Sequence, residues 1–212
     1  MKLLSVLMLL LSSFIANASL ISIDIENASF EQANPFNYVH PNRNGTGVDA
    51  QYNRSVIGWT GFGWGTMDSV DFMYTAVDGN NNVWSNGGYI EQILTSALNA
   101  GTYTFSLWFG ERDDTQGLPT SSAQLFAGNV LIGEIIATAN DVNDGWAFFS
   151  ASFDVSEDNA ALGESLRIRI NSGGTQVLVD DVRLSLTQVP EPSALFLLSL
   201  GLLGLGARRV HK

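Results

Sequence analysis

Hydrophobic and polar residues alternate over several short stretches of this chain. Such alternation predicts β-strands that bury one face and leave the other in solvent. The clearest examples are Ile21–Ile25, Thr102–Phe109 and Ser165–Ile170. Val130–Ala137 and Trp146–Phe153 also have strand character, with less regular alternation.

Turn-forming residues separate these stretches. Clusters rich in Gly, Asn and Asp lie at 78–82, 99–101 and 171–174, and such clusters are typical of tight connections. Only Glu91–Leu98 has a possible helical period, and the polar segment 32–53 is predicted to be a long loop. Many short strands without alternating helices favour an all-β antiparallel sandwich.

The N-terminal end has the pattern of an export signal. Lys2 precedes the apolar run Leu3–Leu11, and Ala16-Asn17-Ala18 supplies the small residues of a cleavage site. A charged start, a short apolar run and small residues together predict a secretory signal peptide over residues 1–18.

The C-terminal end carries a second apolar run, Ala194–Ala207, between Val189-Pro190-Glu191-Pro192 and Arg208-Arg209. A helix rises about 1.5 Å per residue, so this run is shorter than a hydrocarbon core of about 30 Å. The basic residues behind it favour the cytoplasmic side, which places the body outside. These properties alone leave open a transient, processed anchor and a permanent C-terminal anchor.

The tail resembles the PEP-CTERM sorting signal of Gram-negative bacteria, because Val189, Pro190, Glu191 and Pro192, the apolar run, and Arg208 and Arg209 occur in that order. The resemblance implies a transient anchor in the inner membrane that an exosortase cleaves near Pro-Glu-Pro. It also implies delivery to the cell surface or extracellular matrix, with association with exopolysaccharide or biofilm. The expected organisation is a signal peptide (1–18), a β-sandwich (19–188) and a sorting tail (189–212).

The charge of the predicted body narrows the classes of partner. Residues 19–188 contain 6 Lys and Arg against 20 Asp and Glu, which gives a net charge of −14. This balance argues against a basic patch for nucleic acid and permits divalent cations and neutral sugars. The chain has no cysteine, so disulfides do not stabilise it.

Four short segments of the body resemble galactose-binding-like jelly rolls, a group that includes several carbohydrate-binding modules. They are the opening segment Ile25–Glu31, the segments Tyr89–Leu94 and Ala100–Ser106, and the closing segment Val179–Leu184. The resemblance implies a jelly-roll sandwich. It also implies a structural calcium that joins Glu31 to Asp180 or Asp181.

The strand alternation slips at Asp180-Asp181, between the apolar residues Val179 and Val182. A β-bulge would produce this slip, and bulges often redirect side chains near functional sites. Two adjacent carboxylates among apolar neighbours need a cation or hydrogen-bond donors if they are buried. The alternative is that Arg167, Arg169 or Arg183 pairs with these acids on the sheet surface.

Four tryptophans are candidate ligand-binding residues. Trp59 and Trp64 lie in the Gly-rich segment 58–65, Trp84 lies in a loop-like segment, and Trp108 falls on the polar side of its strand. Exposed flat rings of this kind stack on sugars. The alternative is that these rings belong to the core, as aromatic side chains in sandwiches commonly do.

The residue composition of the body argues against nucleophilic catalysis. The body has no cysteine and a single histidine, His40, and it lacks a nucleophile-elbow motif. A glycosidase carboxylate pair stays open, because its separation is a three-dimensional quantity. We therefore predict that the protein is not an enzyme but an exported protein that binds extracellular polysaccharide. A purely structural matrix protein and, after it, a polysaccharide-active hydrolase are the alternatives.

Overall fold

Eleven β-strands, all paired antiparallel, make up the described part of the chain. The computed structural model describes residues 18–40, 50–68, 75–111, 117–142, 145–174 and 176–188. Within these ranges there is no helix long and apolar enough to cross a membrane. The strands are β1 (Ser19–Ile23), β2 (Tyr38–His40), β3 (Ala50–Tyr52), β4 (Thr60–Asp68), β5 (Asn81–Ala97), β6 (Gly101–Glu111), β7 (Ser121–Ala127), β8 (Val130–Ala137), β9 (Trp146–Val155), β10 (Ser165–Ser172) and β11 (Val177–Gln188).

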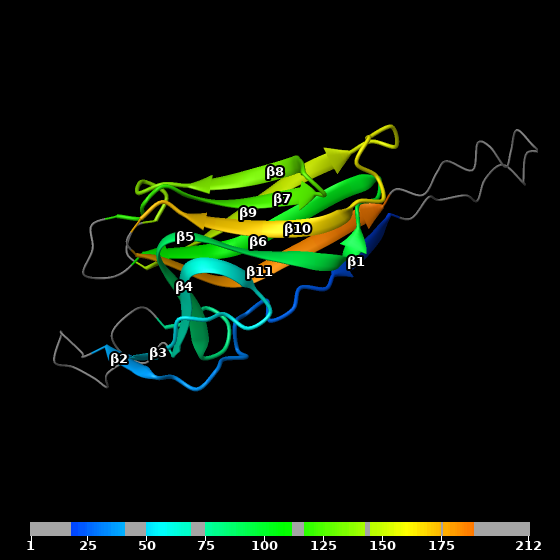
Figure 1. Cartoon of the computed structure of the whole chain (residues 1–212). Coiled ribbons are helices and arrows are strands. Elements are labelled where there is room, and N and C mark those ends of the chain that lie inside the picture. The colour runs from blue at the N-terminus through cyan, green and yellow to red at the C-terminus, as the bar shows by residue number, and fades with distance from the viewer. Residues whose placement is uncertain are drawn as a thin grey trace, which may run out of the picture.

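The strands form two layers that are joined through β5 (Figure 1). One layer runs β8-β7-β10-β5, and the other contains β9, β6, β11 and β1. The first part of β5 pairs with β11, and its later part pairs with β10. Where the second part begins, Gly87 and Gly88 have φ angles of 112° and 99°, values that favour glycine. The fold is an antiparallel β-sandwich, as the strand pattern predicted, and it is of the jelly-roll type that the resemblance implied.

The core lies between the two layers and is built from alternate residues of each strand. In β6, Tyr103, Phe105, Leu107 and Phe109 are all 0% exposed. Leu166, Ile168 and Ile170 supply the facing side chains from β10. Because burying one large apolar side chain stabilises a fold by roughly 1.5–3 kcal/mol, this alternation is the main source of stability.

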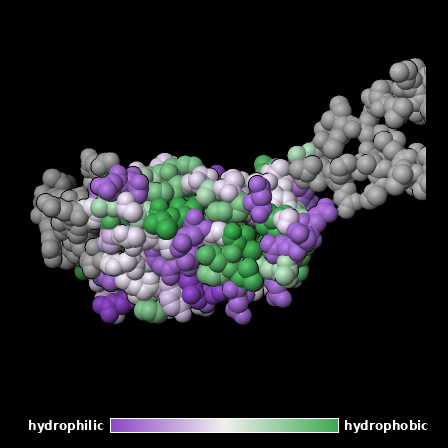
Figure 2. Space-filling model, turned by 90° about the horizontal axis from the view of Figure 1, so that it is seen from above, coloured by the Kyte–Doolittle hydropathy of each residue, from purple (hydrophilic) through white to green (hydrophobic). Residues whose placement is uncertain are grey.

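The edge strands β8 and β9 carry several exposed apolar side chains. β8 is the uppermost strand in Figure 1, and the view from above shows hydrophobic areas interrupted by hydrophilic ones (Figure 2). Val130, Leu131 and Ile136 of β8 and Phe148 of β9 are between 47% and 57% exposed. The outer surface of the sandwich is therefore apolar in places.

The predicted β-bulge in the closing strand is confirmed. The register between β11 and β6 shifts between Asp180 and Arg183, and Asp181 has a φ of 50°. Val179 before the bulge and Val182 after it both lie in the core. The bulge therefore lets Asp180 point out of the core while the strand continues with apolar residues inside.

Two of the local predictions are wrong. Glu91–Leu98 lies largely within β5 and is not a helix. Its alternation was hidden by Gln92, a buried polar residue whose amide bonds the backbone of Glu26 and Gly58. The segment 32–53 is not one loop, because it contains the short strands β2 and β3.

The Gly-rich segment 58–65 contributes most of its residues to β4. Its glycines allow close approach of β5. A Cβ at Gly61 would lie 2.0 Å from the Tyr89 carbonyl oxygen, and one at Gly63 would lie 1.8 Å from that of Gly87. Glycine therefore serves strand packing here.

Candidate active site

A row of residues that we call the tryptophan row crosses the outer face of the layer that contains β11. Residues paired across antiparallel strands point to the same face, so the register places these side chains side by side. In order across the sheet, the tryptophan row is Trp146, Gly110, Leu178, Trp84 and Gly65.

A second row, the Asp180 row, lies beside it on the same face. Asp180 pairs with Trp108, which pairs with Phe148. On the other side of Asp180, the order is Asn82, Met67 and Tyr52. Asn82 stands one position beyond Val83, the last residue of β5 that pairs with β11. The acid therefore lies in the middle of a largely aromatic row.

The two tryptophans of the first row lie directly on neighbouring backbone. A Cβ at Gly110 would come within 2.7 Å of Trp146 Cε3, and one at Gly65 within 2.8 Å of Trp84 Cε2. Glycine leaves the space that each ring occupies. The rings therefore form a floor close to the sheet.

Further aromatic contacts complete this floor. The Tyr52 ring meets the Trp84 ring edge-on at a centroid distance of 5.4 Å, and Trp108 lies 5.3 Å from Phe148. Leu178, 0% exposed, packs with Met67 beneath these rings. The floor is apolar apart from Asp180 and Asn82.

Asp180 is fully buried and held by backbone donors. Its Oδ2 accepts the N–H groups of Val77 at 2.7 Å and Asp78 at 3.0 Å, and its Oδ1 accepts the N–H of Asp181 at 2.7 Å. Burial raises the pKa of Asp180 to about 7, although these hydrogen bonds act in the opposite direction. A carboxyl group with this pKa can give up and take back a proton near neutral pH.

Two polar side chains beside the acid make no hydrogen bond with any described residue. They are Asn82, which is 0% exposed and has both amide atoms unbonded, and the buried Nε1 of Trp84. An unsatisfied buried polar atom costs free energy. A polar group of a ligand on this floor could therefore bond to either of them.

The segment Thr75–Asn81 covers the acid. The Trp146 indole N–H donates to the Thr75 carbonyl at 3.0 Å, and Asp180 accepts from Val77 and Asp78. At the far end of the segment, Glu31 Oε1 accepts the N–H groups of Asn80 and Asn81 at 2.9 Å and 2.8 Å. Carboxylates from two sides thus fix this segment.

The predicted calcium ligands lie near one another but are already engaged. Glu31 and Asp180 bind the same segment, whereas Asp181 accepts the Arg183 Nε–H at 2.7 Å. Among the described residues no three His, Cys, Asp or Glu side chains form a group suited to a metal ion. Calcium binding by Glu31, Asp180 and Asp181 stays a prediction.

The structure separates the four predicted tryptophans into two pairs. Trp84 and Trp108 are half-buried and lie on the floor beside Asp180. Trp59 and Trp64 are 7% and 4% exposed and belong to the core. The prediction that this second pair presents its rings to a ligand is wrong, because Trp64 points inward from β4 and Trp59 packs into the core from the turn before β4.

Trp146 and Asn82 were not among the predicted site residues. Trp146 could have been found from alternation in β9, because Ala147 and Phe149 pack against the core and Trp146 therefore points outward. Alternation gives no such signal for Asn82, because its position beside Asp180 depends on the register between β5 and β11.

The family comparison identifies the body of the chain. A family model described as HpiC1 cyclase matches residues 21–185, a range that contains both rows. The chain belongs to the HpiC1-like family. The prediction of a non-catalytic polysaccharide-binding or structural protein is therefore wrong, because the match indicates a cyclase-like catalytic domain. The sequence argument excluded only catalysis by nucleophiles, which a buried proton-donating acid does not need.

Solved structures show the same fold in related cyclases. A Stig cyclase from Fischerella sp. TAU, in complex with (3Z)-3-(1-methyl-2-pyrrolidinylidene)-3H-indole, aligns with a TM-score of 0.65 and 20% identity over 82% of this chain and 100% of its own. A cyclase from Fischerella sp. TAU with bound 4-(1H-Indol-3-yl)butan-2-one aligns with a TM-score of 0.62 and 20% identity over 79% of this chain and 98% of its own. No curated protein matches the chain.

The tail prediction is confirmed at the level of the motif. A PEP-CTERM protein-sorting motif matches residues 188–210, and this motif implies export and membrane-anchored processing by an exosortase in Gram-negative bacteria. Residues 1–17 of the predicted signal peptide and the residues from Val189 onward lie outside the described residues. The domain boundaries stay predictions.

Proposed function

We propose that this HpiC1-like protein catalyses acid-initiated ring closure of a planar, apolar substrate. The observation that carries the proposal is the position of Asp180, an acid whose pKa burial raises to about 7, in the middle of a largely aromatic row. A proton donor in a water-poor aromatic site suits a reaction that passes through a cation.

Each part of the site has a role in this reaction. Asp180 gives its proton to an unsaturated carbon of the substrate, and an internal π bond then attacks the resulting cation to form the new ring bond. The faces of the aromatic rings stabilise the positive charge. The three backbone N–H groups stabilise the carboxylate that Asp180 becomes. The cyclised cation then returns one proton to this carboxylate. The product therefore has the same composition as the substrate and is its isomer.

The aromatic side chains of the floor favour a substrate with an aromatic ring system. Two solved structures of cyclases from Fischerella sp. TAU contain bound indole compounds. We infer that an indole or a similar flat ring system with an unsaturated side chain lies on Trp84 and Trp146, with the side chain toward Asp180.

A turnover assay tests this function. The full chain is incubated with indoles that carry unsaturated side chains, and the expected product has the same mass and a different chromatographic retention. Asp180→Asn should abolish it, whereas Asp154→Asn, an exposed carboxylate of β9 on the same layer, should leave it unchanged. Full turnover by Asp180→Asn would contradict the proposal.

The sorting motif supports a proposed location and partner. We infer that the processed enzyme resides at the cell surface or in the extracellular matrix. There it would associate with extracellular polysaccharide or biofilm. Fractionation of cells with and without an exosortase tests this, and accumulation of the unprocessed chain in the membrane is expected without it.

A structural calcium is the remaining proposal. Its support is that Glu31 fixes the segment that covers Asp180, and that calcium prefers carboxylate and carbonyl oxygens. Because Asp180 serves as the proton donor, Asp181 is the carboxylate of the closing strand proposed as the ligand. The role of the calcium would be to stabilise the segment over the site.

A further inference from the structure

The outer face that carries the active site changes character at the bulge of β11. Before the bulge its outward residues are Leu178 and Asp180, and after it they are Arg183, Ser185 and Thr187. The register shift between Asp180 and Arg183 makes this change abrupt. An aromatic half and a polar half therefore meet at the acid.

The neighbouring strands change at the same line. In β6, Trp108 is followed toward the polar half by Ser106 and Thr104, which pair with Arg183 and Ser185. β1 extends the polar half, because Ser22 pairs with Ser185. The hydroxyl-bearing side chains therefore form a continuous area beside the aromatic floor.

Part of this polar half is a groove and not a flat sheet surface. Its volume is about 650 Å³, and its lining includes Ser22, Thr104, Ser106, Asp181, Arg183 and Ser185. Residues of the loop before β2 form one wall, and Asp78 also lines it. Since the Asp78 N–H donates to Asp180, the groove adjoins the segment that covers the active site.

The chemistry of the groove suits a neutral, hydroxyl-bearing group. Serine and threonine hydroxyls both donate and accept hydrogen bonds, and Ser106 is only 8% exposed. The lining carries three aspartates, Asp24, Asp78 and Asp181, against the single arginine Arg183. This excess negative charge disfavours an anionic group.

We propose that the substrate is amphiphilic, with a flat apolar ring on the aromatic floor and a neutral polyhydroxylated substituent in the groove. This inference rests on the proposed function, because it places the two parts of one substrate on either side of Asp180. It gives the substrate class as a ring system joined to a sugar-like group.

Calorimetric titration of the full chain with three probes tests the proposal. The probes are β-naphthol, β-naphthyl glucoside and β-naphthyl glucuronide, which share a flat ring and differ in the substituent. A few hydrogen bonds in the groove should make the glucoside bind about 10-fold more tightly than naphthol. The anionic glucuronide should bind more weakly than the glucoside.

Variants localise the effect. Ser106→Val should remove most of the preference for the glucoside and leave naphthol affinity unchanged. Ser185→Ala, a smaller change in the groove, should reduce the preference in the same direction if Ser106→Val folds poorly. Ser150→Val is the matched control, because Ser150 of β9 pairs with Ser106 of β6 but does not line the groove.

The results separate this inference from the proposed function. Equal affinity for naphthol and its glucoside, or equal loss of both in Ser106→Val, would overturn the amphiphilic substrate even if Asp180-dependent ring closure is observed. A glucoside preference that depends on Ser106 would support it even if the turnover assay fails.

Discussion

Asp180 and Trp108 face each other across β11 and β6, at the last regular pair before the bulge. The pairing places a buried acid against an aromatic ring, while the bulge at Asp181 returns Val182 to the core. A single extra residue in one strand thus positions the acid without opening the hydrophobic core.

The first prediction concerns the pH dependence of stability at Asp180. Burial raises its pKa from the ordinary 3.8 to about 7, so the folded state binds this proton more tightly than the unfolded chain does. The resulting stability is fully present below the ordinary pKa and is lost as the pH rises to about 7, by about 4 kcal/mol. Asp180→Asn cannot titrate and should lack this loss.

Denaturant unfolding at several pH values, compared between wild type and variant, measures the difference. Asp154→Asn should retain the wild-type dependence. Turnover by the wild type should also fall above about pH 7, as the acid loses its proton. An identical pH dependence in Asp180→Asn and wild type would show that Asp180 does not titrate in this range.

The sandwich was predictable from the chain because alternation within a strand is a local property. The same pattern correctly put Trp108 on an outward face and the bulge near Asp180. Register is different, because it depends on hydrogen bonds between segments far apart in the chain. No pattern within β5 tells that Trp84 lies beside Leu178, so the two rows could not be assembled from the sequence.

The second prediction concerns the space that Gly110 leaves for Trp146. An alanine Cβ would lie 2.7 Å from the indole carbon Cε3, so the ring must move away from the sheet. Gly110→Ala should cost roughly 1–3 kcal/mol of stability, as overpacking does, and should lower turnover because the floor is displaced. Urea unfolding and the turnover assay measure the two effects.

Gly174→Ala is the control for this substitution. Its Cβ would meet Pro119 at an ordinary contact distance of 3.5 Å, and the site lies elsewhere. Wild-type stability and turnover in Gly110→Ala would mean that Trp146 does not depend on this contact.

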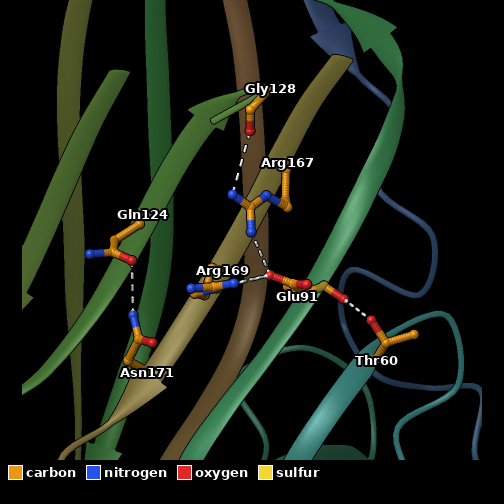
Figure 3. Close-up of polar contacts among 7 residues, drawn as sticks. All are labelled: Thr60, Glu91, Gln124, Gly128, Arg167, Arg169 and Asn171. Carbon is orange, nitrogen blue, oxygen red and sulfur yellow. Dashed lines mark hydrogen bonds and ion pairs between the residues drawn. The ribbon is translucent and has the colours of Figure 1, made fainter. Parts of the chain in front are cut away.

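The third prediction concerns the opposite layer, where Glu91 joins two arginines (Figure 3). Its Oε2 lies 2.8 Å from Arg167 Nη1 and 2.7 Å from Arg169 Nη2. Arg167 stacks on Phe126 at 4.5 Å, and Arg169 stacks on Tyr89 at 4.5 Å. Glu91→Gln would leave two adjacent, partly buried cations and should cost roughly 1–3 kcal/mol.

Acid titration distinguishes this ion-pair effect from simple packing loss. Burial raises the pKa of Glu91, but the hydrogen bonds and charges of Arg169 and Arg167 outweigh it and hold the pKa below its usual value. The stability from Glu91 is therefore present above the ordinary pKa and is lost as the pH falls through the folded value. Glu91→Gln should lack this acid-side loss, whereas Glu157→Gln, on an exposed turn, should keep it.

The fourth prediction concerns calcium and the segment over the site. A calcium ion between Glu31 and the closing strand would bind the folded state but not the unfolded chain, and would therefore stabilise the fold by mass action. Thermal unfolding in millimolar calcium should then occur at a higher temperature than in EGTA, with no such increase for magnesium, which prefers a smaller and more rigid oxygen site. Glu31→Gln should lose the calcium-dependent increase, and Glu157→Gln should retain it.

An equal unfolding temperature in calcium and EGTA would contradict this prediction. It would mean that the backbone N–H groups of Asn80 and Asn81 alone satisfy Glu31, and that the segment is held without a metal.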